Sequence, residues 1–182
     1  MTATIDHAIT EERLSSAPAR LSLTPPTSAP GLLDGAWWPR SGDLLREIPA
    51  LADALDARWG RITRAIVNPA HWPVIPRRVP VIGHIVHVGW FAAEQDPNKL
   101  ILLSYTMGRL DLLVIPPETE PAAADRLMAA AAVPGSLRTA SGLMADEAMR
   151  CDAAEIRSRE EEWETDGGAA STAGRLSSAP RR

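Results

Sequence analysis

The pattern of apolar and polar positions predicts five β-strands. Residues 20–23 alternate polar and apolar side chains and stop at two prolines, and residues 81–91 are rich in β-branched side chains. Two apolar runs are separated only by Met107 and Gly108, a spacing typical of a β-hairpin. The expected strands cover residues 20–23, 61–68, 81–91, 99–106 and 109–115.

Apolar residues with helical spacing predict a helix that buries one side. They recur every three or four positions: Leu44, Ile48, Leu51, Leu55 and Trp59. Ser41 is expected to cap this helix, and Pro49 to divide it into a short turn and a second segment that begins at the proline. Gly60 is expected to end it.

The remaining pattern completes an α+β fold. A second helix follows the prolines at 116–117, with its inner face at Ala124, Leu127, Met128 and Ala131. Residues 68–80 contain too many prolines for a central strand and are expected to form an extended connection. The order of elements predicts a mostly antiparallel sheet of about five strands, with helices packed on one face.

The composition of the two ends predicts the domain organisation. Residues 1–18 are polar and small and are expected to form a disordered tail. Residues 19–148 are expected to form a single α+β domain. Residues 149–182 combine a charged helix with a disordered Gly/Ala/Ser-rich tail.

A two-residue turn at Met107 and Gly108 would fix the register of the hairpin. Ser104 would then pair with Asp111, and Ser104, Thr106, Arg109 and Asp111 would share one polar face near the turn. This polar cluster is either a solvated hairpin end with an Arg109–Asp111 ion pair or the wall of a ligand pocket.

The adjacent tryptophans are the second candidate feature. Side chains of neighbouring residues in an extended segment point in opposite directions, so Trp37 or Trp38 fills the core while the other lines a cleft. Arg40 stands beside the N-terminus of the predicted helix, whose free N–H groups favour anions. The candidate ligand-binding residues are Trp37, Trp38, Arg40, Ser104, Arg109 and Asp111.

Composition narrows the classes of function. The net charge is −4, from 19 basic and 23 acidic residues, so nucleic acid is not an expected partner. Cys151 is the only cysteine, and His84 and His87 would point to opposite faces of a strand, so no metal site is expected. There is no secretory signal pattern and no apolar stretch of about 20 residues, which predicts a cytoplasmic protein without a membrane partner.

The chain resembles an actinobacterial family known only as a domain of unknown function. The resemblance rests on segments such as RLSLTPP, RITRAIVNPAHWP and NKLILLSY, covers residues 20–148, and has GAWWPRS as its most distinctive motif. It implies a soluble bacterial protein and supplies no catalytic residue, cofactor or substrate.

The sequence is compatible with two functions. Aromatic residues expected at the surface, without an acid–base constellation, favour a non-catalytic binding or regulatory module that uses its tryptophan-containing surface for a small molecule or a protein. The alternative is a small enzyme acting on an anionic metabolite, with Arg40 and Arg109 holding the anion and Asp111 or Asp43 as the base. Whether the protein is an enzyme, and which cofactor it would use, is not decided by the sequence.

Overall fold

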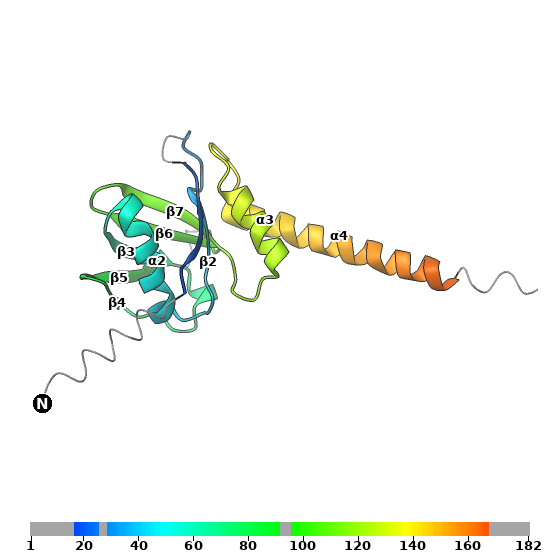
Figure 1. The fold of residues 1–182 in the computed structure, drawn as a ribbon, viewed down its shortest axis with the longest axis horizontal. Helices are drawn as coiled ribbons and strands as arrows, with labels where there is room; N and C mark the ends of the chain where they lie inside the picture. The colour runs from blue at the N-terminus through cyan, green and yellow to red at the C-terminus, as the bar shows by residue number, and fades with distance from the viewer. Residues whose placement is uncertain (1–16, 26–28, 92–95, 168–182) are drawn as a thin grey trace, which may run out of the picture. The chain divides into compact units, whose positions relative to one another are not determined.

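A seven-stranded mixed sheet forms the centre of the fold (Figure 1). The computed structural model describes residues 17–25, 29–91 and 96–167, and the chain divides into two units, residues 1–144 and 145–182. Across the sheet the strands follow the order β1 (Arg20–Leu23), β2 (Gly35–Trp38), β7 (Gly108–Val114), β6 (Lys99–Ser104), β3 (Ile62–Val67), β5 (His84–Trp90) and β4 (Arg78–Val81). The pairs β2–β7 and β3–β5 are parallel, and the other four pairs are antiparallel.

The α+β class is confirmed, but the sheet has seven strands instead of the expected five or so. The missing strands are β2 and β4. All four residues of β2 are buried, so it shows none of the alternation that marks a strand with one solvated face. β4 lies at the edge of the sheet, where Pro80 costs little because an edge strand has one row of unpaired backbone groups.

The expected strand at residues 81–91 is instead part of a hairpin. β4 and β5 pair through Val81 and His84, which leaves Ile82 and Gly83 as a two-residue turn. Gly83 has a φ of +75°, a left-handed conformation that glycine adopts without a steric penalty.

The helix α2 (Leu44–Trp59) carries the predicted apolar stripe. Asp43, rather than Ser41, caps it, because the Asp43 carboxylate accepts the Leu45 N–H at 2.9 Å. Pro49 lies within one continuous helix instead of dividing it, since buried residues on both sides of it pack into the core. Gly60 ends the helix with a φ of +71°, as predicted.

Helices cover both faces of the sheet, and the expectation of one covered face is wrong. Leu112 on β7 packs with α2 residues, whereas the next residue, Leu113, packs with residues of α3 (Pro121–Ala131). Because neighbouring residues of a strand point to opposite faces, α2 and α3 lie on opposite sides. The main contacts of α3 are with β1 and β2, far from β4 in the strand order.

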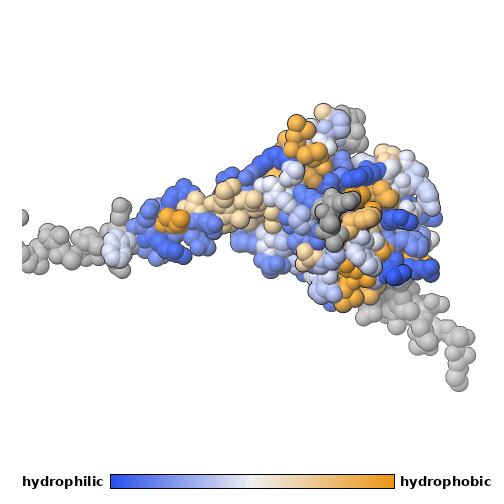
Figure 2. All heavy atoms as spheres, turned by 180° about the vertical axis from the view of Figure 1, so that it is seen from behind, coloured by the Kyte–Doolittle hydropathy of each residue, from blue (hydrophilic) through white to orange (hydrophobic). Residues whose placement is uncertain are grey.

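The short 3-10 helix η1 (Pro69–His71) and the long helix α4 (Ala140–Gly167) complete the fold. Ala140 and Leu143 at the start of α4 pack into the same cluster as α3. The later part of α4 is the charged helix expected from the sequence, and mostly hydrophilic side chains cover it (Figure 2). No helix in the described part of the chain has the length and apolar character needed to cross a membrane.

Candidate functional site

The hairpin between β6 and β7 does not have the predicted register. Ser104 pairs with Gly108, and Asp111 pairs with Ile101, so three residues form the turn. A three-residue hairpin loop is typically followed by a residue in the left-handed conformation. Gly108, which follows the three turn residues and pairs with Ser104, has a φ of +80° and is in this position.

The register separates the residues of the predicted polar cluster. Asp111 shares a face with Arg109, and Ser104 projects from the opposite face. There the Ser104 hydroxyl donates to the carbonyl of Trp59 at 3.0 Å, and Thr106 Oγ1 donates to the same carbonyl at 3.3 Å. These two hydroxyls supply hydrogen-bond donors to the free Trp59 carbonyl at the C-terminal end of α2. The prediction that Ser104 and Asp111 line one pocket wall is wrong.

Trp37 and Trp38 point to opposite faces of the sheet, as predicted. Trp37 is 1% exposed and stacks on Trp72, with ring centroids 5.7 Å apart, so it fills the core beneath α2. Trp38 is only 8% exposed, and the Arg20 guanidinium covers its ring at 3.4 Å. The Trp38 side chain therefore faces no open cleft, and its Nε1 has no hydrogen-bond partner among the described residues.

The N-terminus of α2 is occupied by the protein's own carboxylates. Glu47 accepts the Arg40 N–H at 3.0 Å and the Ser41 hydroxyl at 2.8 Å, and Asp43 accepts the Leu45 N–H. The Arg40 guanidinium donates to the Pro18 carbonyl at 3.3 Å. Because two negative side chains already hold the positive end of the helix, this position favours no further anion.

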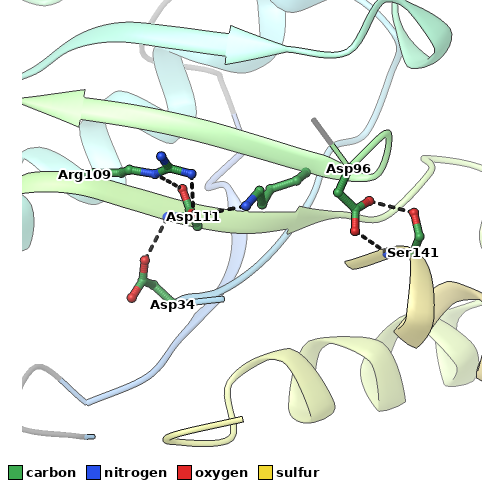
Figure 3. Close-up of polar contacts among 6 residues, drawn as sticks. Asp34, Asp96, Arg109, Asp111 and Ser141 are labelled. Carbon is green, nitrogen blue, oxygen red and sulfur yellow. Dashed lines mark hydrogen bonds and ion pairs between the residues drawn. The ribbon is translucent and has the colours of Figure 1, made fainter. Parts of the chain in front are cut away.

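Arg109 and Asp111 belong to a balanced cluster of four charges (Figure 3). Arg109 donates two hydrogen bonds to Asp111, at 2.7 and 2.9 Å, and Lys99 Nζ lies 3.2 Å from the same carboxylate. Asp34 accepts the Asp111 N–H at 2.8 Å. Burial raises the pKa of Asp34, and the hydrogen bonds from its guanidinium to Asp111 raise the pKa of Arg109. Two positive and two negative side chains leave no charge here for a ligand to neutralise.

Arg40 and Asp111 lie toward opposite ends of β2. Asp34, which contacts Asp111, immediately precedes this strand, and Arg40 follows it. Six residues of extended chain span about 20 Å at about 3.3 Å per residue. The two arginines of the expected anion clamp therefore do not converge on one site.

A second polar contact in Figure 3 fixes the start of α4. Asp96 accepts hydrogen bonds from the Ser141 N–H at 2.9 Å and the Ser141 hydroxyl at 2.6 Å, and one from the Asn98 N–H at 3.0 Å. Burial alone would raise the pKa of Asp96, but these hydrogen bonds outweigh it and lower the pKa. The contact joins the β5–β6 connection to the helix and is structural.

A concave pocket of 510 Å³ lies at the other end of the sheet, over β3, β5 and β4. We call it the arginine pocket. Its lining consists of Arg64, Ile66, Arg77, Arg78, His87, Val88, Gly89, Trp90 and Phe91. The volume is within the range of small-molecule sites, about 300–1,000 Å³.

Strand pairing brings the basic residues of the arginine pocket into one row. His87 on β5 pairs with Arg78 on β4 and with Arg64 on β3. Paired residues share a face of the sheet, and their Cβ atoms lie about 5 Å apart. Val86 and Val88, on either side of His87, are buried beneath α2, so the row projects from the opposite face.

The arginines of the pocket have no partners in the described part of the chain. Arg64, Arg77 and Arg78 are exposed, and no described carboxylate lies within ion-pair distance of them. This contrasts with Arg109, which is paired with Asp111. No group of three or more metal-ligating side chains occurs among the described residues.

The sequence contained one signal for this pocket. Arg77 and Arg78 are the only adjacent basic pair outside the C-terminus. The sequence did not indicate that Arg64 and His87 lie near this pair, because the parallel pairing of β3 with β5 links segments that are distant in the chain. A register shift between Ile62 and Arg64 also breaks the alternation of β3.

Comparison with known proteins places most of this domain in one family. The sequence model of DUF5994, a family of unknown function, matches residues 20–131. The match includes all seven strands, α2, α3 and the residues of the arginine pocket. Neither the curated proteins nor the solved structures include one that matches this chain.

Proposed function

The chain belongs to the family of unknown function DUF5994, and we propose that it is a non-catalytic module that binds an anionic small molecule in the arginine pocket. One observation carries this proposal. Three arginines and a histidine line a single concavity, and no described carboxylate neutralises the arginines. Like charges held together repel each other, and a bound anion would relieve that repulsion.

The chemistry of the lining favours binding over catalysis. None of its nine residues is a carboxylate, serine, cysteine or lysine, so the pocket offers neither a common nucleophile nor an acid–base pair. His87 is the one lining side chain suited to proton transfer, and no described group orients its ring. A general base normally needs such an orienting partner.

The residues expected to form the site of an enzyme acting on an anionic metabolite do not come together in the structure. It required Arg40 and Arg109 to converge beside a carboxylate, but Arg109 pairs with Asp111 whereas Arg40 lies toward the other end of β2. A regulatory role, a cytoplasmic location and a small-molecule partner are the parts of the sequence-based hypothesis that we retain in this proposal.

Titration calorimetry with pyrophosphate at low ionic strength tests the proposal. We expect saturable binding by the full chain. The double variant R64A/R78A should bind at least about 100-fold more weakly, because each charge-assisted hydrogen bond contributes about 1.5–3 kcal/mol. Thermal unfolding of this variant should match that of the parent protein, since both side chains are exposed.

The matched control is R46A/R58A, which removes two exposed arginines from α2. It changes the net charge by the same amount but leaves the pocket intact, so its affinity should stay within about twofold, which is a few tenths of a kcal/mol. Equal losses in both double variants would mean that pyrophosphate responds only to net charge, and would contradict the proposal.

A further inference from the structure

The arginine pocket has a basic end and an apolar end. The row of Arg78, His87 and Arg64 forms the basic end. Two residues further along β3 and β5, Ile66 pairs with Gly89, and Phe91 follows in the chain. Side chains two apart on a strand share a face, so the polarity changes along the direction of the strands. A ligand that fits both ends carries its negative charge on one side only.

At the apolar end, Gly89 has no side chain and leaves an open space above the backbone. A Cβ placed on Gly89 would meet no atom within 4 Å, so a ligand can approach the backbone here. The neighbouring Phe91 side chain is unusually accessible, at 58% exposed. Trp90 pairs with the buried Val67 and therefore projects from the other face of the sheet. The exposed ring of Phe91, beside the open space above Gly89, is suited to stacking on a planar group of a ligand.

The number and type of basic groups indicate the chemistry of the charged end. Three guanidinium groups present many N–H donors in a planar arrangement that matches the oxygens of phosphate. A single carboxylate would neutralise only one of them. The apolar end is also short, with the side chains of Ile66 and Phe91, and provides no long channel for an alkyl chain.

Building on the proposed function, we propose that the ligand is a phosphate compound that carries a planar ring, as in a nucleotide. Its phosphates lie at Arg64, Arg77 and Arg78, and its ring stacks on Phe91 above Gly89. The same chemistry is available from a free nucleotide and from one residue of a single-stranded nucleic acid. The pocket volume of 510 Å³ accommodates one such unit.

The test compares four probes by titration calorimetry on the full chain: pyrophosphate, ADP, octanoate and an oligothymidylate of five residues. We expect ADP to bind about 5- to 100-fold more tightly than pyrophosphate, the range for stacking of one base on an aromatic side chain. F91A should remove this advantage and leave the affinity for pyrophosphate unchanged. Y105A is the matched control, because Tyr105 is an exposed aromatic residue in the β6–β7 turn and does not line the pocket.

The outcomes separate this inference from the proposed function. If pyrophosphate binds but ADP binds no more tightly, or if F91A leaves the affinity for ADP unchanged, the planar ring is excluded while the anion site remains. Octanoate binding more tightly than ADP also overturns the inference. If no anion binds, the proposed function itself fails.

The oligonucleotide distinguishes the two sources of the ligand. Binding at least tenfold tighter than ADP, with a steep decrease on adding salt, would assign the pocket to single-stranded nucleic acid. Affinity equal to or below that of ADP would assign it to a free nucleotide. Both results support the shared chemistry.

Discussion

Replacement of Trp37 by alanine is expected to destabilise the fold by about 3–5 kcal/mol, the usual cost of removing a large buried aromatic side chain. The Trp37 side chain is fully enclosed between the sheet and α2, and its ring stacks on Trp72. The mutation leaves a cavity and removes this stacking. Because domains of this size are stable by about 5–15 kcal/mol, the loss is a large fraction of the total.

Urea unfolding followed by circular dichroism measures this loss. The matched control is Trp163→Ala in α4, where the side chain is 82% exposed and the expected change is below about 0.5 kcal/mol. A cost below about 1 kcal/mol for Trp37→Ala would mean that Trp37 does not hold the core, and would contradict the described packing.

Gly35→Ala is the second substitution with a large expected effect. Gly35 has a φ of +151°, and a Cβ at this position would overlap the carbonyl oxygen of Ser22 on the neighbouring strand. Strain at such a position costs about 1–3 kcal/mol, and the overlap also forces β1 away from β2. We therefore expect a destabilisation of about 3 kcal/mol or more in urea unfolding.

Gly83→Ala separates the two causes. Gly83 also has a positive φ, but a Cβ there meets no atom within 4 Å. It should show only the conformational cost of about 1–2 kcal/mol. If Gly35→Ala is no more destabilising than Gly83→Ala, the close approach of β1 to β2 is not a constraint on residue 35.

The parts of the fold that were predictable are those with one buried side. The stripe from Leu44 to Leu55 and the inner face of α3 around Leu127 repeat at helical spacing, and both are buried as expected. β2 was missed because it is buried on both sides. β4 was missed because Pro80 argued against a strand.

The candidate site was less predictable, because it depends on pairing between distant segments. The predicted polar wall required a two-residue turn at Met107 and Gly108, but the chain forms a three-residue turn that places Ser104 and Asp111 on opposite faces. The arginine pocket requires β3 to pair with β5 in parallel, with η1 and β4 between them in the chain. A local pattern does not contain this information.

The most direct test of anion binding in the arginine pocket is an NMR titration that observes the Nε–Hε groups of the arginine side chains while pyrophosphate is added. The signals of Arg64, Arg77 and Arg78 should shift together and saturate with one dissociation constant, while those of Arg40 and Arg109 stay in place. Saturable shifts at Arg40 or Arg109 instead, or no saturable shift at the three pocket arginines, would contradict the account.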